Sequence, residues 1–283
     1  SILKGHFKGI KMSLKEEINY SLWCDFIERD FLENRFKEII KKQIIQGATS
    51  NPAIFESSIS NSVAYKQQLD MLQANNAKTI YEELALTDIK RAAFLLDKLH
   101  KNDSDDGFIS IEVDPLLCDD AAGTIEEGVR LYSQINAENV MIKVPATEAG
   151  YIAMRELTSR GINVNATLIF SPAQAIKCAQ ALDEGIKDSN KDIKAVISVF
   201  VSRLDRLADG DFALKGLQTS KLGIVNATKC YHEVNKFKNP NIRTLFASTG
   251  VKGNELSPTY YVDNLIFPNS VNTAPLATIE DWL

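Results

Sequence analysis

Short apolar runs alternate with longer segments of helical periodicity along almost the whole chain. About eight such runs are present, at residues 22–26, 44–49, 108–113, 140–145, 162–170, 195–201, 243–248 and 262–267. Strands that alternate with helices are typical of α/β proteins with a parallel sheet. Eight of them in 283 residues favour a single-domain α/β fold, a closed (β/α)8 TIM barrel. An open doubly wound sheet is the alternative, but no G-x-G-x-x-G motif follows any run.

The segments between these runs carry their apolar residues on one stripe, as helices that cover a sheet do. The clearest examples are residues 84–99, 125–135 and 173–186. Two helix starts are marked by a capping side chain before a proline, Asn51 before Pro52 and Ser171 before Pro172. These segments are therefore expected to be the helices of the outer layer.

The chain is expected to form one domain, over residues 12–283, because no internal repeat or low-complexity linker divides it. Residues 1–11 are basic and show no clear period, and Met12 follows them. We interpret residues 1–11 as a leader or an expression remnant outside the fold.

Composition narrows the class of ligand. The formal net charge is −5, and basic residues are scattered, so we expect small-molecule partners and no nucleic-acid or membrane partner. The cysteines (Cys24, Cys118, Cys178, Cys230) and the histidines lie far apart, which indicates neither a zinc site nor a disulfide framework. No apolar stretch approaches the roughly 18 residues that span a bilayer. We expect a cytoplasmic protein, a monomer or a homodimer.

One apolar run contains a charged residue, Lys143 in the sequence VMIKVPA. Side chains in a strand alternate between two faces, so Val140, Ile142 and Val144 form an apolar face for the helices. Lys143 then points into the barrel together with Met141. Burial disfavours the ammonium form of a lysine, and a neutral amine can attack a carbonyl carbon to form a Schiff base.

The runs on either side of this strand also divide into a polar and an apolar face. The polar faces consist of Ser110, Glu112 and Asp114 in one run and Asn163, Asn165 and Thr167 in the other. The apolar face of the second run consists of Val164, Ala166 and Leu168. A parallel strand covered on both sides should be apolar on both faces. Polar residues that point inward from several strands therefore indicate an active site at the mouth of the barrel.

Two motifs resemble the signatures of the transaldolase family. GATSNPAIF at residues 47–55 resembles the signature near its second strand, and MIKVPAT at residues 141–147 resembles its Schiff-base signature. Shorter pieces follow in family order, namely LWCD at 22–25, SIEVDP at 110–115, NATLIFS at 165–171, SVFVSR at 198–203 and ASTG at 247–250. The resemblance runs from about residue 22 to the end.

This resemblance implies a cofactor-free barrel enzyme of the non-oxidative pentose phosphate pathway. Transaldolases move a dihydroxyacetone unit from a ketose phosphate, such as sedoheptulose 7-phosphate or fructose 6-phosphate, to an aldose phosphate. The acceptors are glyceraldehyde 3-phosphate or erythrose 4-phosphate. The resemblance implies that Lys143 holds the transferred unit as a Schiff base.

The resemblance also implies roles for polar residues around the lysine. Glu112 is expected to act as acid and base through a water that Thr167 holds. Asp25 is expected to take the proton of a substrate hydroxyl as the carbon–carbon bond breaks, since two carboxylates in different surroundings can hold different protonation states. Asn51 and Asn165 are expected to bind substrate hydroxyls.

Phosphate is expected at Ser198 and Arg203, which match the family's phosphate pair, because a guanidinium can grip phosphate bidentately. Lys252 would add a second positive charge, although the family often has arginine in this region. Phe200 is expected to line the substrate site. The related fructose 6-phosphate aldolases carry a tyrosine at this position and lack the acid at Glu112, so we expect a transferase. The alternatives are a lyase of that type and a non-catalytic sugar-phosphate binding barrel.

Structural explanations compete with these roles. Lys143 and Glu112 could form a structural ion pair, and Asn51 could serve only as a helix cap. Asp25 could pair with a basic group at the end of its strand. Cys24 is interpreted as a small core residue, since no histidine lies in the constellation.

Purely structural roles are alternatives for three other candidate residues as well. Asn165 and Thr167 could satisfy each other inside the barrel. Arg203 could pair with Asp205 or Asp209 on a solvated helix.

The end of the chain departs from the family pattern. About 16 residues follow Phe267, whereas the family ordinarily continues through a final helix and a tail. Residues 204–220 are also short for the helical segment expected after the sixth strand. We therefore expect a barrel whose C-terminal helix and tail are shortened or lie outside this sequence.

Overall fold

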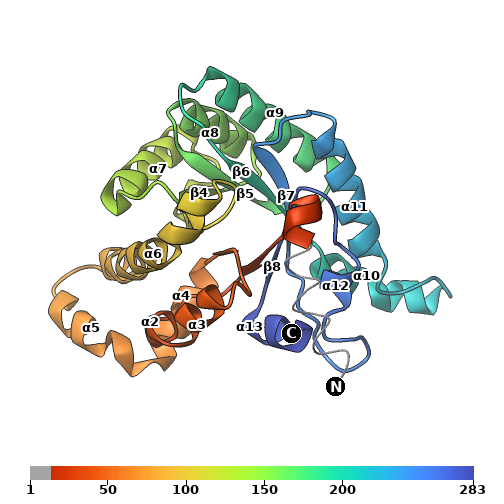
Figure 1. The fold of residues 1–283 in the computed structure, drawn as a ribbon, viewed down its shortest axis with the longest axis horizontal. Coiled ribbons are helices and arrows are strands. Elements are labelled where there is room, and N and C mark those ends of the chain that lie inside the picture. The colour runs from red at the N-terminus through yellow and green to blue at the C-terminus, as the bar shows by residue number, and fades with distance from the viewer. Residues whose placement is uncertain (1–13) are drawn as a thin grey trace.

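The computed structural model describes residues 14–283, so the N-terminal segment interpreted as a leader lies outside the described residues. Eight parallel strands pair in chain order, and the first pairs with the last to close a barrel (Figure 1). Their bounds are β1 Ser21–Cys24, β2 Gly47–Ala48, β3 Ile109–Glu112, β4 Val140–Pro145, β5 Asn163–Ile169, β6 Ala195–Phe200, β7 Ile242–Ala247 and β8 Ser270–Ala274. The predicted (β/α)8 barrel is confirmed.

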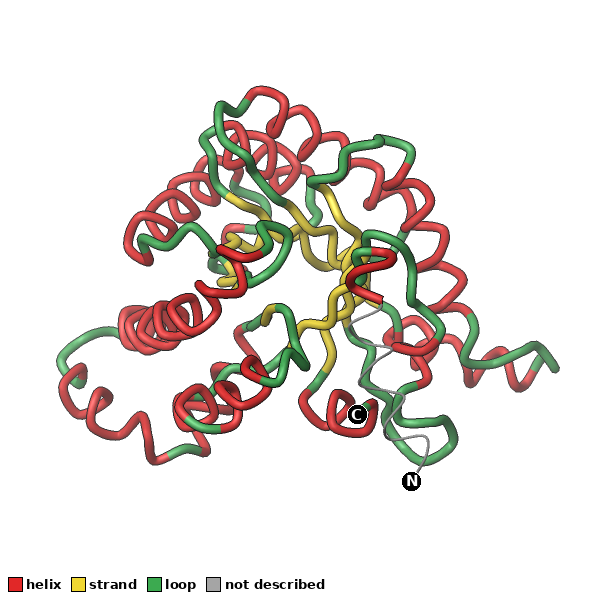
Figure 2. The backbone as a smooth tube through the Cα atoms, viewed as in Figure 1, coloured by secondary structure: helices red, strands yellow, loops and turns green. Residues whose placement is uncertain are grey.

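Helices surround the barrel and form its outer layer (Figure 2). Their bounds are α2 Arg29–Glu33, α3 Arg35–Lys41, α4 Pro52–Asn61, α5 Lys66–Leu72, α6 Ala77–Asn102, α7 Ala121–Ile135, α8 Glu148–Ser159, α9 Pro172–Asp188, α10 Ser202–Leu214, α11 Leu222–Asn235, α12 Tyr260–Asp263 and α13 Leu276–Trp282. Within residues 14–283, no helix has the length and apolar character needed to cross a bilayer.

Both predicted helix starts are confirmed. Asn51 caps α4 by accepting a hydrogen bond from Ile54 N at 3.0 Å. Ser171 caps α9 by accepting one from Gln174 N at 3.3 Å. The proline after each cap has a φ that suits the first helical position. The three helices predicted from apolar stripes lie within α6, α7 and α9.

Two apolar clusters divide the strand residues by face. The outer cluster joins the strands to the helices and includes Val140, Ile142 and Val144 of β4. The inner cluster fills the barrel and consists of Trp23, Phe108, Met141, Val196, Phe200, Leu245, Ala247 and Val271. The alternation predicted for β4 is therefore confirmed, and Lys143 shares the inner face with Met141.

β5 departs from strict alternation near its C-terminal end. Its register against β6 shifts between Ala166 and Ile169, and Leu168 has a left-handed φ of 61°. Leu168 is 37% exposed, so its predicted place on the buried apolar face is wrong. A bulge of this kind turns the side chains next to it in a new direction. Asn165, before the bulge, and Thr167, within it, are both buried.

The apolar run at residues 262–267 does not form the eighth strand, so this prediction is wrong. The run lies in α12 and the loop after it, from which Val262 and Leu265 pack into the outer core. β8 comes later and pairs with β7 and β1. Its polar members are Ser270, Asn272 and Thr273. These side chains form hydrogen bonds with Phe267, Thr249 and Thr49, respectively. Since β8 is largely polar, it lacks the apolar pattern by which strands are predicted. The helix α13 follows β8.

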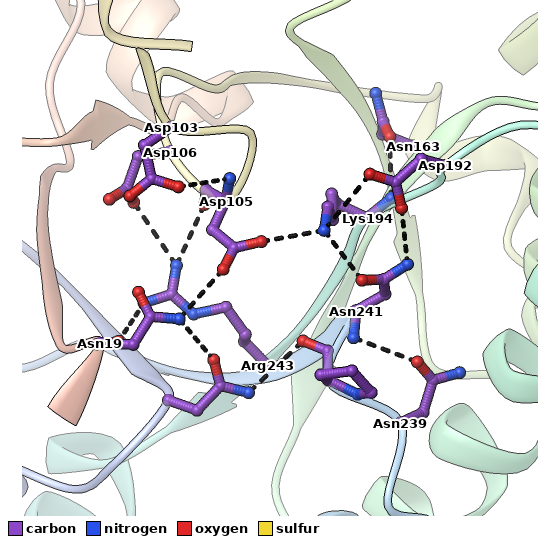
Figure 3. A network of polar contacts seen from close by, with 12 residues as sticks. Asn19, Asp103, Asp105, Asp106, Asn163, Asp192, Lys194, Asn239, Asn241 and Arg243 are labelled. Atoms are coloured by element: carbon purple, nitrogen blue, oxygen red, sulfur yellow. Dashed lines mark hydrogen bonds and ion pairs between the residues drawn. The ribbon is translucent and has the colours of Figure 1, made fainter. Parts of the chain in front are cut away.

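Arg243 closes the amino-terminal end of the barrel (Figure 3). Its buried guanidinium donates to Asp105 O at 3.0 Å and to Asn19 O at 2.7 Å. An ion pair with Asp106 at 3.4 Å balances its charge, and Lys194 extends the network to the Asp105 carboxylate at 2.9 Å. Paired and hydrogen-bonded charges are tolerated in such a buried position. Since this end is filled, the carboxyl ends of the strands are where a ligand can enter, as in other barrels of this type.

Candidate active site

Lys143 lies near the C-terminal end of β4 between polar neighbours. It pairs in register with Glu112 of β3 and with Asn165 of β5. Its side chain is buried, and Nζ donates a hydrogen bond to Ser50 O at 3.2 Å. A buried amine at the C-terminal end of a barrel strand stands where catalytic groups of this fold usually lie.

Glu112 faces the amine from the neighbouring strand. Its Oε2 lies 3.9 Å from Lys143 Nζ, which is longer than a hydrogen bond. Burial raises the pKa of Glu112 above its ordinary value, while the charge of Lys143 lowers that pKa and the charge of Asp25 raises it. The separation argues against a tight structural ion pair, the simpler explanation of a lysine buried beside an acid.

Asp25 follows β1 directly and is held by a backbone hydrogen bond from its N–H to Ala274 O at 2.9 Å. Its Oδ1 accepts a hydrogen bond from Thr49 Oγ1 at 2.8 Å. Burial raises the pKa of Asp25, whereas Lys143, the Thr49 hydrogen bond and Arg203 lower it. Asp25 therefore accepts a hydrogen bond from a hydroxyl and not from a basic side chain, and the charge of Lys143 lowers its pKa.

Asn165 takes part in a line of hydrogen bonds that crosses β6, β5 and β3. Ser198 Oγ donates to Asn165 Oδ1 at 2.6 Å, and Asn165 Nδ2 donates to Ser110 Oγ at 3.0 Å. The side chain of Asn165 thus bonds with Ser198 and Ser110, and not with Thr167 as the structural alternative supposed. Ser198 is 2% exposed, so it lies in the barrel wall and contacts Asn165.

Asn51 lies at the mouth of the barrel, at the start of α4, and is half-buried. The capping bond from Ile54 N occupies its Oδ1. Its Nδ2 carries two N–H donors that can face a ligand. The segment before it is fixed by Ser50, whose hydroxyl donates to Ser110 O at 2.7 Å. Capping and ligand binding by Asn51 are therefore compatible.

Arg203 presents a positive charge in the first turn of α10. Its guanidinium carbon lies 4.8 Å from the ring centroid of Phe200, and the ring of Phe200 packs against that of Phe170 at 5.2 Å. A guanidinium over an aromatic face is attracted by the ring electrons. The two rings thus support an exposed cation. Lys252 is exposed in the loop after β7.

The acidic residues of α10 have partners other than Arg203. Asp205 accepts a hydrogen bond from Tyr261 Oη at 2.7 Å. Asp209 accepts from Ser220 N at 2.8 Å and from Ser220 Oγ at 3.1 Å. The alternative in which Arg203 pairs with these carboxylates is therefore not supported by the contacts that they make.

Cys24 belongs to the outer apolar core and is fully buried. Burial raises the pKa of its thiol far above the ordinary value, and the neighbouring Asp25 raises it further. A thiol in this environment stays protonated and is a poor nucleophile. Its interpretation as a packing residue is confirmed.

Three residues next to the expected site, Thr49, Ser50 and Thr273, were not predicted from the sequence. Thr49 and Ser50 lie in the motif that predicted Asn51, so their position in the chain could have suggested them. Thr273 lies on β8, which the apolar pattern did not find. Its hydroxyl is 2.6 Å from that of Thr49.

A closed barrel with a buried lysine, two partly buried carboxyl groups and an exposed arginine near the carboxyl ends of its strands is typical of barrel enzymes of the aldolase type. A sequence profile of the transaldolase/fructose-6-phosphate aldolase family matches residues 22–283, and the chain belongs to this family. It is 50% identical over 273 residues to a transaldolase of Campylobacter jejuni subsp. jejuni serotype O:23/36 (strain 81-176), a match that covers 93% of this chain and 82% of that protein. It is also 50% identical over 264 residues to a transaldolase of Helicobacter pylori (strain Shi470), with 93% of this chain and 81% of that protein covered.

Proposed function

We propose that this protein is a transaldolase that transfers a dihydroxyacetone unit from a ketose phosphate to an aldose phosphate, as a step of the pentose phosphate pathway. The observation that carries the proposal is the burial of Lys143 in β4, with Glu112 Oε2 3.9 Å from its amine. Relatives named transaldolase that are 50% identical over most of the chain support it. The amine and the carboxyl groups supply the chemistry, so we propose no cofactor.

The proposed reaction begins when Lys143 Nζ attacks the ketone carbon and water leaves, which gives an iminium ion. The positive iminium draws in the electron pair of the adjacent carbon–carbon bond as that bond breaks. The aldose product departs, and the three-carbon fragment stays on the lysine as an enamine. An acceptor aldose then adds to the fragment by the reverse steps, and water releases the new ketose.

Glu112 is the proposed acid and base for loss and return of water. Burial raises its pKa, which keeps a proton available close to the amine. The 3.9 Å gap between Glu112 Oε2 and Lys143 Nζ suits transfer through a bridging water. Thr167, buried at the end of β5, is proposed to hold that water.

Asp25 is proposed to accept the proton of the substrate hydroxyl during bond cleavage. Asn51 and Asn165 are proposed to bind hydroxyls of the retained fragment, and Ser198 acts through Asn165, to which it donates. Asn51 contributes its amide donors, since its oxygen caps α4.

The cations outside the barrel are proposed to bind the phosphate. Arg203 is the main candidate, because Phe200 supports its guanidinium and the side chain is exposed. Lys252 is proposed as a second, weaker contact. Sugar phosphates are thus the proposed ligands, in the cytoplasm, where such metabolites are interconverted. A monomer and a homodimer are both compatible with this site.

A lyase that releases free dihydroxyacetone is the second candidate function, because the matching family includes fructose-6-phosphate aldolases. Phe200 has no hydroxyl to donate a proton, and its ring is packed under Arg203. Proton transfer must then come from Glu112, which favours the transferase. A barrel that only binds sugar phosphates would not require the buried amine of Lys143 or the carboxyl groups of Glu112 and Asp25.

The test follows consumption of fructose 6-phosphate with and without erythrose 4-phosphate. Turnover that requires the aldose acceptor supports transfer, whereas steady release of dihydroxyacetone without an acceptor would assign the lyase. Borohydride added with the donor should reduce the iminium and label one peptide by mass. Retained activity with position 143 unlabelled would contradict the proposed mechanism.

A further inference from the structure

Two buried threonine hydroxyls connect β8 to Asp25. Thr49 Oγ1 lies 2.8 Å from Asp25 Oδ1, and Thr273 Oγ1 lies 2.6 Å from Thr49 Oγ1. Thr49 is 1% exposed and Thr273 is 3% exposed. Thr273 is two residues from Val271, a member of the inner cluster, so both point into the barrel.

The backbone holds the three residues in this arrangement. Thr49 N donates to Cys24 O at 2.9 Å, and Asp25 N donates to Ala274 O at 2.9 Å. The end of β8 is fixed further by Thr249, whose hydroxyl lies 2.7 Å from Asn272 Oδ1 and 3.1 Å from Thr273 O. The short hydroxyl contacts therefore follow from strand pairing.

The charge of Asp25 sets the direction of both hydrogen bonds. An ionised carboxylate can only accept, so Thr49 must give its one hydroxyl proton to Asp25 Oδ1. Thr49 Oγ1 then accepts the proton of Thr273. Without the Thr273 hydroxyl, Thr49 Oγ1 loses the donor contact at 2.6 Å that keeps its own proton directed at Asp25.

We propose that Thr273 is a positioning residue for Asp25: through Thr49 it directs a hydrogen bond to Oδ1 and leaves Oδ2 to exchange a proton with the substrate. This inference rests on the proposed transaldolase chemistry. In the cleavage step the substrate O–H bond breaks, and its proton bonds to Asp25 Oδ2. The O–H electron pair becomes the new carbonyl π bond, and the carbon–carbon pair moves to the enamine and neutralises the iminium.

The role has a consequence for the pH dependence. Burial raises the pKa of Asp25, and the Thr49 hydrogen bond is one of the effects that lower it. The other groups that act on Asp25 are Lys143 and Arg203, which lower its pKa, and the acid Glu112, whose charge is coupled to it. The Cys24 thiol stays protonated, and a change at position 273 alters none of these groups. Losing the hydroxyl at 273 should therefore raise the pH at which Asp25 loses its proton.

The test compares Thr273→Val, which keeps the shape, with Thr273→Ser, which keeps the hydroxyl. Thr273→Val should lower kcat for transfer about tenfold and move the acid limb of the kcat/KM profile upward by roughly half to one pH unit. Thr273→Ser should restore most of both. The KM for fructose 6-phosphate and the borohydride adduct at Lys143 should change little, because the amine is untouched.

Thr244→Val is the matched control. Thr244 is a buried threonine of β7 whose hydroxyl has no hydrogen-bond partner among the described residues. Its substitution removes a buried hydroxyl of the same kind, and transfer and the pH profile should stay as in the wild type.

A Thr273→Val enzyme with wild-type kcat and pH profile would overturn the inference, and so would a Thr273→Ser enzyme as impaired as Thr273→Val. If Thr273→Val does not fold, Thr49→Val must shift the acid limb in the same direction. A Thr49→Val enzyme without that shift would also overturn the inference. Failure of the proposed function is separate, because it would show as a wild-type enzyme without acceptor-dependent transfer or without an adduct at Lys143.

Discussion

Lys143 and Glu112 occupy paired positions on β4 and β3, and Nζ of the first lies 3.9 Å from Oε2 of the second. The amine and the carboxyl are close enough to influence each other and too far apart for a direct hydrogen bond. The charge of Lys143 lowers a carboxyl pKa that burial raises. A change in either residue therefore affects the protonation of the other.

Replacing the amine should abolish transfer. Lys143→Met removes the nucleophile, and we expect kcat to fall more than about a thousandfold and the borohydride adduct to disappear. Asp25 and Glu112 lose the positive charge that lowers their pKa, so both carboxyls should hold a proton more readily in this variant. Lys177→Met, at an exposed lysine of α9, is the control and should keep its activity. Substantial transfer by Lys143→Met would contradict the assignment.

Glu112→Gln should slow turnover far more than it weakens donor binding. The amide keeps the shape but cannot carry the proton, so we expect kcat to fall about a hundredfold while the donor KM changes less than about threefold. Steady-state kinetics over a pH series would also show a wild-type limb above the usual glutamate pKa of about 4.3, because burial raises the pKa of Glu112. Equal losses in kcat and in binding would indicate a structural role.

The ionised carboxylate of Asp25 should lower the free energy of unfolding at neutral pH. Burial raises its folded-state pKa above that of the unfolded chain, so the folded protein binds the proton more tightly. Its favourable contribution is fully present below the unfolded pKa of about 3.9 and is lost as pH rises through the folded pKa. Asp25→Asn keeps an oxygen for Thr49 and should be more stable than the wild type at pH 7, by roughly 1 kcal/mol.

The pH dependence of the stability difference between Asp25→Asn and wild type is the control for this prediction. The unfolding free energies of Asp25→Asn and wild type should converge as the pH falls below the unfolded pKa of about 3.9, because the folded-state pKa lies above it. A difference in unfolding free energy that stays constant from pH 4 to pH 8 would show that the raised pKa is not its cause.

Arg203 should govern affinity for the phosphate and leave the chemistry intact. Arg203→Gln should raise the KM for fructose 6-phosphate by about ten- to a hundredfold, with a smaller effect on unphosphorylated fructose as donor. Phe200→Leu removes the ring beneath the guanidinium and should raise the same KM about threefold. Arg206→Gln is the control, since Arg206 contacts Ser202 at 3.0 Å. An equal effect of Arg203→Gln on both donors would contradict phosphate binding.

Arg243 should be essential for folding. Arg243→Met removes the donor to the backbone carbonyls of Asn19, Asp105 and Ser270, whereas Asp106 keeps its ion pair with Lys15 at 2.6 Å. Because these carbonyls lose a charged donor in a buried place, we expect a loss of about 3–5 kcal/mol of unfolding free energy. The control is Arg160→Met, which removes an exposed ion pair with Glu156 and should cost less than about 1 kcal/mol. Urea unfolding of both variants measures the difference, and equal stabilities would mean that the closed end of the barrel does not depend on this charge.

Local periodicity was sufficient to predict β1 to β7, the inward orientation of Lys143 and the caps at Asn51 and Ser171. These features depend on residues that are close in the chain, where alternation in a strand and a proline after a polar cap follow from backbone geometry. The family motifs then marked candidate site residues without any knowledge of the strand order.

Only the tertiary structure decided the rest. β8 is polar, and its Thr273 acquires a partner only when the closing of the barrel brings Thr49 beside it. The bulge that exposes Leu168 depends on the register with β6, and the filling of the amino-terminal end by Arg243 depends on residues up to 224 positions away. A buried polar side chain is stable wherever the fold supplies its partner, and pairings between distant segments leave no periodic pattern in the chain.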